Sequence, residues 1–369
     1  MPAAPLPLPS TPLPIVGAPM AGGVSTPELV AAVSNAGGLG MLAAGYLTPD
    51  QLAADIAATR ALTDAPFGVN LFVPEQLTPD EAALARYGAQ LGPDFARFGI
   101  DIPTPGWKDT DFWREKIAML AEDPLPVVSF TFGLPSEGEE RLLHALGTAL
   151  IGTATTEREA RACVAAGMDA IVLQGTEAGG HRATHRVSAE PEDTPLDDLL
   201  AAVRPLTHLP LIAAGGVTSR SRVRSLLDAG ASLVQIGTAL VRTPESGAPQ
   251  LYKDALALRT GTVLTRAFTG RYARALRNRF TDAHSATAPA LYPQVGQLTG
   301  PLRKAAAAAG DEENLHLWAG TGHAHARTTP AAAAKCLMSI CPRNWGGASV
   351  RDCPRSGGVG IVGVGFSWL

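Results

Sequence analysis

The sequence predicts an α/β protein built on a (β/α)8, TIM-like barrel, with a small second domain, mainly helical, over the carboxyl-terminal face of the barrel. Three observations support this fold class: short aliphatic runs alternate with helical patterns, hydroxyl side chains mark the helix starts, and the alternation stops after Val241. Because crossover connections return each strand in the same direction, such alternation requires parallel pairing. Eight units of this kind favour a closed barrel over an open sheet.

The expected strands are short aliphatic runs bounded by Gly, Pro or Thr. In chain order they are Pro14–Ala18, Leu39–Leu42, Phe67–Leu71, Val127–Phe130, Ala149–Gly152, Ala170–Gln174, Leu211–Ala214 and Leu233–Gly237. Helix starts are expected where a capping hydroxyl precedes a helical pattern, as in Ser25-Thr26-Pro27-Glu28, Thr48-Pro49-Asp50, Thr155-Thr156-Glu157 and Thr218-Ser219-Arg220. Gly37 and Gly167 predict the ends of two of these helices.

The remaining chain departs from this rhythm and sets the expected domain boundaries. We assign residues 1–250 to the barrel, 251–310 to the helical second domain, 311–334 to a return segment packed on the barrel, and 335–369 to an atypical, disordered tail. An insertion at Gln90–Lys108 is expected to fold over the rim of the barrel. The tail shows neither helical nor strand period, so no structure is predicted for it.

Composition excludes several classes of protein. Lys and Arg number 30 against 34 Asp and Glu, giving a net charge of −4, and no basic stripe is present, so nucleic-acid binding is not expected. The N-terminus lacks the charged and apolar regions of a signal peptide, and no apolar run reaches the roughly 18 residues of a membrane helix. With only 4 cysteines, a disulfide scaffold is not expected either. We expect a cytoplasmic protein whose oligomeric state the sequence leaves open.

The residues directly after the expected strands are the candidates for a site, because active sites of such barrels lie at the carboxyl ends of the strands. Glycine pairs follow the seventh strand, at Gly215-Gly216, and stand in the loop after the sixth, at Gly179-Gly180, while Gly237-Thr238 follows the eighth. The loops after strands seven and eight are the usual phosphate site, and both are expected to lead into helices whose N-termini favour an anion. The alternative is that these glycines only form tight turns.

Two amides and one histidine add to this pattern. Asn70 and Gln174 stand at strand ends, where an amide can pair with the edge of a flat heterocycle or simply cap a loop. Together with a phosphate site they indicate a phosphorylated aromatic cofactor such as flavin mononucleotide (FMN). His181 lies in a glycine-rich loop and is a candidate base or hydrogen-bond donor, or else an exposed structural histidine. Its spacing from His185 matches helical zinc ligands, but the preceding glycines argue against a helix, so no metal is expected.

Ordered motifs along the chain resemble those of the nitronate monooxygenases, formerly called 2-nitropropane dioxygenases. They are Ala18-Pro19-Met20-Ala21-Gly22-Gly23, Ser34 to Gly40, Phe67 to Pro74, Gln174 to Arg182, Ala213 to Gly216, Gln235 to Thr238, Gly270 to Arg274, Asn278 to Phe280, Leu298 to Arg303 and Leu317 to Gly320. The resemblance implies a barrel that binds FMN non-covalently, with His181 as the catalytic residue. The expected cofactor-binding residues are Ala18, Pro19, Met20, Asn70, Gln174, Gly179, Gly180, Gly215, Gly216, Gln235, Gly237 and Thr238.

The activity that the resemblance implies is oxidation of alkyl nitronates, such as propionate 3-nitronate, with O₂ to carbonyl compounds and nitrite through a flavin semiquinone. Two alternatives stay open from the sequence. The same fold could serve an FMN-dependent NAD(P)H oxidoreductase acting on quinones or enoyl thioesters, or the chain could bind flavin without catalysis.

Overall fold

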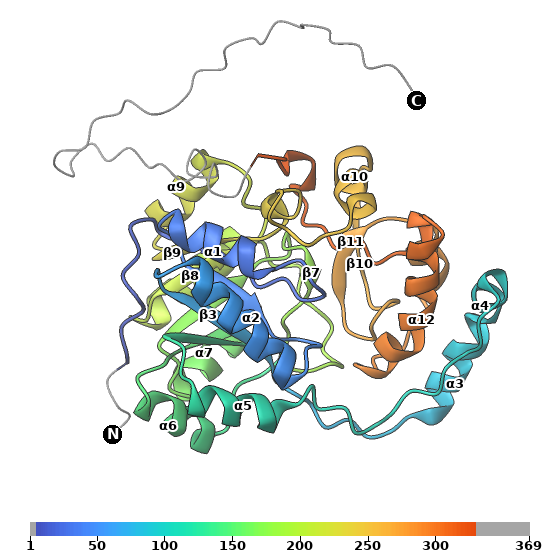
Figure 1. Ribbon diagram of the computed structural model, residues 1–369, viewed down its shortest axis with the longest axis horizontal. Helices are drawn as coiled ribbons and strands as arrows, with labels where there is room; N and C mark the ends of the chain where they lie inside the picture. The colour runs from blue at the N-terminus through green and yellow to red at the C-terminus, as the bar shows by residue number, and fades with distance from the viewer. Residues whose placement is uncertain (1–4, 330–369) are drawn as a thin grey trace, which may run out of the picture.

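Eight parallel strands form a nearly closed barrel in the computed structural model, which describes residues 5–329 (Figure 1). Their order is β1-β9-β8-β6-β5-β4-β3-β2, and a single parallel bridge between Val16 and Leu39 links β1 to β2. The strands are β1 (Ile15–Gly17), β2 (Gly40–Ala43), β3 (Phe67–Phe72), β4 (Val127–Thr131), β5 (Ala149–Ala154), β6 (Ala170–Gln174), β8 (Leu211–Ala214) and β9 (Leu233–Ile236). The predicted barrel and its eight strands are confirmed.

Helices cover the outside of the barrel, and α1, α2, α7 and α9 begin where the capping hydroxyls predict. They are α1 (Pro27–Asn35), α2 (Pro49–Leu62), α5 (Trp113–Glu122), α6 (Glu137–Ala145), α7 (Glu157–Ala165), α8 (Leu196–Val203) and α9 (Arg220–Asp228). The side chains of Thr26, Thr48, Thr156 and Ser219 each accept a backbone N–H of the first turn. Gly167 ends α7 with a left-handed φ of +73°, which favours glycine.

The strands bury both faces. One aliphatic cluster joins their outer side chains to the helices, and a second fills the interior, where Leu8 of the N-terminal segment packs against it. Strands buried on both sides read as continuous aliphatic runs, which is why the sequence revealed them. The carboxyl ends of the strands are left as the face on which a site can form.

A second group of elements lies beside the barrel, and we call residues 250–319 the appended region. It contains α10 (Gln250–Leu258), β10 (Thr262–Thr265), β11 (Ala273–Leu276), α11 (Arg279–His284), α12 (Gln294–Ala308) and the short 3₁₀ helix η3 (Glu312–Asn314). The expectation of a mainly helical segment missed β10 and β11. These strands form an antiparallel sheet with β7 (Gly180–His181), a two-residue strand from the loop after β6.

The insertion folds differently from the prediction. Its helix α4 (Gly92–Phe98), together with the preceding α3 (Glu81–Gln90), packs on α12 of the appended region, on the side away from the barrel (Figure 1). Tyr87 and Phe95 share a buried cluster with Leu298 and Leu302, so the apolar faces of these helices are covered by α12 and not by the barrel rim.

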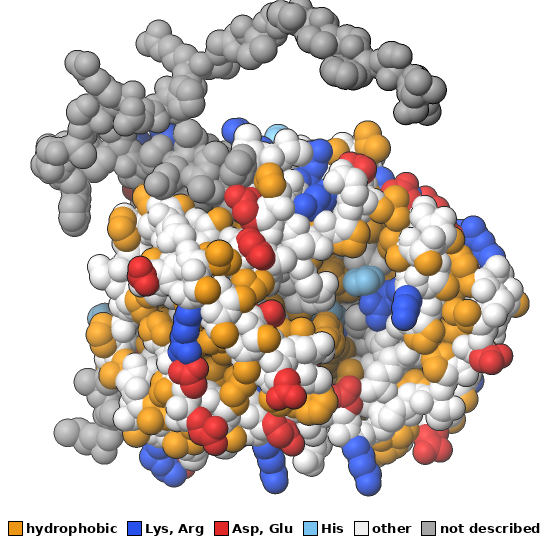
Figure 2. Space-filling model, viewed as in Figure 1, with side chains coloured by type: hydrophobic (Ala, Val, Ile, Leu, Met, Phe, Trp, Pro, Cys, Tyr) orange, Lys and Arg blue, Asp and Glu red, His pale blue; other side chains and the backbone are white. Residues whose placement is uncertain are grey.

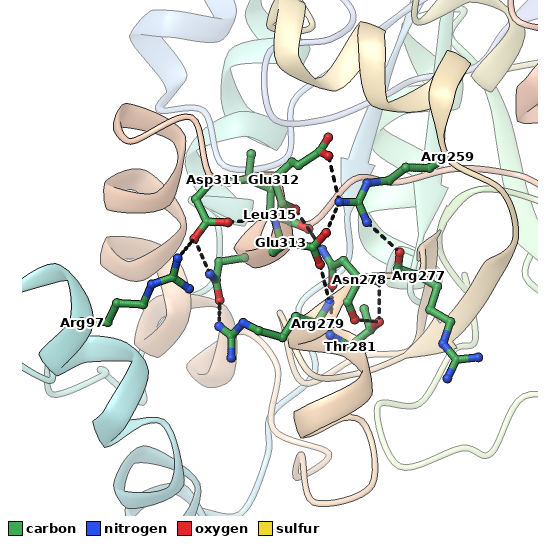
Figure 3. A network of polar contacts seen from close by, with 11 residues as sticks. Arg97, Arg259, Arg277, Asn278, Arg279, Thr281, Asp311, Glu312, Glu313 and Leu315 are labelled. Carbon is green, nitrogen blue, oxygen red and sulfur yellow. Dashed lines mark hydrogen bonds and ion pairs between the residues drawn. The ribbon is translucent and has the colours of Figure 1, made fainter.

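A network of arginines and carboxylates joins distant parts of the appended region (Figure 3). Arg259, just after α10, donates to Glu312 of η3 at 2.9 Å. The Asn278 amide donates to the carbonyl of Glu312 at 3.1 Å, and Arg97 of α4 pairs with Asp311 at 3.0 Å. The network therefore fixes α4, α10 and α11 around one short turn.

Buried Asp94 extends the same connection. One of its oxygens accepts from Arg279 at 2.6 Å and the other pairs with His284 at 2.8 Å. Because Asp94 belongs to α4 while both partners belong to α11, this carboxylate attaches the insertion to the appended region.

The division into a barrel, a second domain and a return segment stays a prediction. Residues 311–329 carry η3 and a second 3₁₀ helix, η4 (His323–His325), and the predicted tail at 335–369 lies outside the described residues. Across residues 5–329, no helix combines the length and apolar character needed to cross a membrane, and no group of three or more His, Cys, Asp or Glu side chains could hold a metal ion.

Candidate active site

A large cavity opens at the carboxyl ends of the barrel strands, and every predicted site residue lines it. Its volume is about 1300 Å³ including the open mouth, and Figure 2 shows a hollow in the surface between the barrel and the appended region. The predicted residues brought together there are Ala18, Pro19, Met20, Asn70, Gln174, Gly179, Gly180, His181, Gly215, Gly216, Gln235, Gly237 and Thr238. Loops far apart in the sequence thus form one wall, as the barrel topology predicts.

The glycine loops leave room for a ligand to approach the backbone. Gly215 and Gly216 have φ values of +131° and +64°, a region that side chains disfavour. Gly179 is needed for packing, because a Cβ there would lie 2.4 Å from the backbone nitrogen of Gly320. Glycine at these positions therefore brings main-chain groups of two loops to the cavity wall.

The sequence predicts that the loops after β8 and β9 both lead into helices. Only the loop after β8 does so. The loop after β8 enters α9, whose N-cap is Ser219. The loop after β9 enters only η2 (Thr238–Leu240), a three-residue 3₁₀ turn, because its backbone bends at Val241 and Thr243 into the segment that leads to α10. Thr238 instead uses its hydroxyl to accept the N–H of Gly320 at 3.0 Å, which ties the return segment to the cavity floor.

The two amides differ in what they contact. Asn70 is buried and donates to Ser129 at 2.9 Å and to Thr131 at 3.0 Å, both on β4. Gln174 uses its amide nitrogen to donate to the carbonyl of His181 at 2.9 Å, and its oxygen accepts the N–H of Ala183 at 3.0 Å. Gln174 therefore holds the strand that carries His181, in addition to lining the cavity.

His181 is fixed from both barrel and appended region. Its backbone pairs with Ala273 of β11, and its Nε2 lies 2.9 Å from the Thr269 hydroxyl. The Thr269 hydroxyl donates its one proton to the carbonyl of Arg271 at 3.1 Å, so it accepts from Nε2–H and Nδ1 is the unprotonated nitrogen. Burial, reinforced by the positive charges of Arg271 and Arg303, lowers the pKa of His181 to about 3. The imidazole is neutral at pH 7.

Two buried arginines near His181 were not predicted as site residues. Arg271 donates to the Thr184 hydroxyl at 3.2 Å, forms an ion pair with Glu75 at 3.6 Å, and stacks over Phe132 with its guanidinium carbon 4.1 Å from the ring centroid. Arg303 donates to the carbonyl of Gly296 at 2.9 Å, and none of its hydrogen bonds or ion pairs within residues 5–329 reaches a carboxylate. Together they give the histidine end of the cavity a positive potential.

An aromatic wall surrounds His181 and was also missed. Phe132, Tyr292 and Trp318 have ring centroids 5.6, 5.7 and 5.3 Å from the imidazole. These residues come from the loop after β4, the segment before α12 and the return segment. The motifs containing Arg271, Arg303 and Trp318 were visible in the sequence, but their meeting point depends on the fold of the appended region.

The comparisons with known proteins agree with this geometry. A family model described as nitronate monooxygenase matches residues 10–342. The chain belongs to the nitronate monooxygenase family. It is therefore an enzyme of the oxidoreductase class, as the sequence predicted.

Relatives of this family extend over nearly the whole described chain. A probable nitronate monooxygenase of Staphylococcus aureus strain Newman is 39% identical over 323 residues, which cover 86% of this chain and 91% of the relative. The crystal structure of a nitroalkane oxidase from Streptomyces ansochromogenes is 49% identical with a TM-score of 0.85, covering 89% of this chain and 95% of that one. FabK from Thermotoga maritima is 26% identical with a TM-score of 0.69, over 89% and 92% of the two chains.

Proposed function

We propose that this member of the family is an FMN-dependent nitronate monooxygenase that oxidises alkyl nitronates, such as propionate 3-nitronate, with O₂ to a carbonyl compound and nitrite. The observation that supports it best is the neutral imidazole of His181 flanked by Arg271 and Arg303 inside an aromatic cavity. Propionate 3-nitronate carries a second negative charge on its carboxylate, whereas a simple alkyl nitronate is a small anion with an apolar tail. Positive potential suits its charged end, and aromatic walls suit its alkyl end.

The cavity fits FMN by the character of its walls. Gly215, Gly216, Gly237 and Thr238 would hold the phosphate through backbone N–H groups and one hydroxyl, near the start of α9. A side chain at Gly216 would come 3.1 Å from Glu177, so the close approach requires glycine. Asn70 and Gln235 would face the ring system. When bound, a flavin supplies electron transfer between the substrate and O₂.

In this proposal, His181 contacts the substrate and offers a ring nitrogen that can accept a proton. Thr269 keeps the ring in one orientation, and Nδ1 is free to accept a proton because Nε2 carries the other. Because the imidazole of His181 is neutral, it adds no charge of its own to those of the two neighbouring guanidinium groups. The charges of the two arginines would favour the anion from behind the cavity wall, while the aromatic rings exclude water.

A second substrate follows from the same nitrogen. A neutral nitroalkane must lose a proton from carbon before it becomes a nitronate. The unprotonated Nδ1 of His181 could accept that proton, but slowly, because a pKa of about 3 makes it a weak base. The similar structure from Streptomyces ansochromogenes is described as a nitroalkane oxidase. We therefore include nitroalkanes as slower substrates.

The test is an anaerobic titration of the FMN-loaded protein with ethylnitronate and, separately, with NADH. We expect the nitronate to bleach the flavin absorbance and to release nitrite once air is admitted, while NADH leaves the flavin oxidised. His181→Asn should lower turnover of nitroethane, which must lose a carbon proton, by about 100-fold, and should lower turnover of ethylnitronate, which needs no such step, much less. Reduction by NADH with no nitrite from any nitronate would favour the NAD(P)H oxidoreductase, and no reduction by either would favour a non-catalytic flavin-binding protein.

A further inference from the structure

Tyr46 stands at the mouth of the cavity. It follows β2, it lines the cavity, and yet 50% of the residue is exposed to solvent, so its ring separates the interior from water. The Tyr292 hydroxyl donates to the Tyr46 hydroxyl at 3.2 Å, and the Tyr46 ring lies edge-on to Phe72 with centroids 5.6 Å apart. These contacts close one side of the opening.

The backbone at Tyr46 is held in a conformation that a tyrosine rarely adopts. Its φ is +71°, in the left-handed region that favours glycine. Asp111 holds it there by accepting the Tyr46 N–H at 2.8 Å. A residue kept in such a conformation by its surroundings often serves a site.

A buried lysine stabilises the backbone before Tyr46 and the Asp111 carboxylate. Lys116 of α5 is 1% exposed, and its ammonium donates to the carbonyl of Ala44 and to the Asp111 carboxylate, both at 2.8 Å. Gly45 fits the same design, because a Cβ there would lie 2.3 Å from the Phe72 ring. The Tyr46 loop is therefore fastened on both sides of the tyrosine and cannot easily move outward.

Aromatic rings connect His181 to Tyr46 in a continuous row. Tyr292 contacts the imidazole at 5.7 Å between centroids and reaches Tyr46 through its hydroxyl. The ring centroids of Phe132 and Phe72 lie 4.6 Å apart and belong to the same row. A substrate whose charged end lies at His181 would extend its apolar tail along these rings toward Tyr46.

We propose that Tyr46 sets the upper length of the substrate's alkyl chain by blocking the end of this aromatic row. The inference rests on the proposed function for the orientation of the substrate, with its anionic end at His181. Methylene groups up to the tyrosine gain affinity from burial, and those beyond it gain none.

The experiment compares FMN-loaded wild type with Tyr46→Ala and, as a matched control that keeps the ring, Tyr46→Phe. Isothermal titration calorimetry with straight-chain carboxylates from propanoate to octanoate gives affinity against chain length without needing turnover. We expect wild type and Tyr46→Phe to reach a plateau at the same chain length. Tyr46→Ala should pass that plateau and gain about fourfold in affinity for each further methylene.

A Tyr46→Ala profile that reaches its plateau at the wild-type length would overturn the proposal, and so would loss of the plateau in Tyr46→Phe. Nitrite release from nitronates of the same chain lengths is measured in parallel. If the carboxylate profiles behave as expected and no nitronate yields nitrite, the length limit stands and the proposed function fails.

Discussion

The barrel and the appended region are stabilised in different ways. The barrel strands pair in parallel with buried aliphatic side chains on both faces, and one large apolar cluster joins them to the surrounding helices. The apolar clusters of the appended region are smaller than that one, and the region also depends on arginine–carboxylate contacts between residues far apart in the chain. Apolar packing tolerates replacement of a side chain by another apolar one of similar volume and shape. A polar network, by contrast, loses contacts when any one partner is replaced. The difference teaches that the two parts should fail under different perturbations.

The largest expected effect is on the barrel side. Leu150 of β5 is fully buried, and Leu150→Ala should lower the free energy of unfolding by about 3 kcal/mol through a cavity in the aliphatic core. Urea unfolding followed by far-UV circular dichroism measures it. The control is Leu258→Ala on α10, where the leucine is 81% exposed and the loss should be close to zero. Equal losses in the two variants would contradict the comparison.

A smaller loss of stability, confined to the elements joined by the polar network, is expected when that network is broken. Asp94→Ala removes the acceptor shared by Arg279 and His284 and should cost about 2 kcal/mol. Hydrogen exchange should increase in α4 and α11, while the amides of the barrel strands stay protected. Glu137→Ala, which breaks an exposed ion pair with Arg141, is the control and should cost less than about 0.5 kcal/mol. Faster exchange in the barrel strands of Asp94→Ala would show that the two parts are stabilised together.

The smallest expected effect is a pH-dependent change in the free energy of unfolding. It arises at His181, which lies at the junction between the barrel and the appended region. Burial lowers the pKa of His181 from 6.5 to about 3. The unfolded chain therefore takes up a proton at this residue as pH falls below 6.5, while the folded chain does not until about pH 3. The stabilisation is complete above pH 6.5 and decreases toward pH 3, and this one residue should account for about 0.7 kcal/mol between pH 7 and pH 6.

Urea unfolding at pH 7 and pH 6 checks this value. In His181→Asn the difference between the free energies of unfolding at the two pH values should shrink by that amount, whereas Leu258→Ala, which removes no titratable group, should leave it unchanged. An unchanged pH dependence in His181→Asn would show that folding does not shift the pKa of His181.

The same contrast explains what the sequence could predict. The barrel strands were recognised because burial on both faces produces uninterrupted aliphatic runs, and the residues after them were found because parallel strands end on one face. β7 has two residues, one of them Gly180, and β11 contains Arg274, so neither has a strand pattern of its own. These strands form only because each finds its partner in space.

The site divides in the same manner. Asn70 lies in β3, Gln174 ends β6 and the glycine pairs follow barrel strands, so all of them could be predicted from their positions near the carboxyl ends. Tyr46 and Phe132 lie in loops whose left-handed backbone no local pattern indicates. Arg271 and Arg303 do not line the cavity and come near His181 only through the fold of the appended region, so the effect of their charges depends on tertiary contacts.

The backbone pairing of His181 with Ala273 has a consequence for protein engineering. Chimaeras of barrel enzymes are usually planned by keeping the barrel and exchanging what lies beside it. Here the catalytic candidate is carried by a strand of the barrel loop that is completed by β11, so the two parts are not interchangeable modules. A graft that replaces residues 250–319 must supply a new edge for Gly180 and His181, or the imidazole loses its fixed position even though its own segment is untouched.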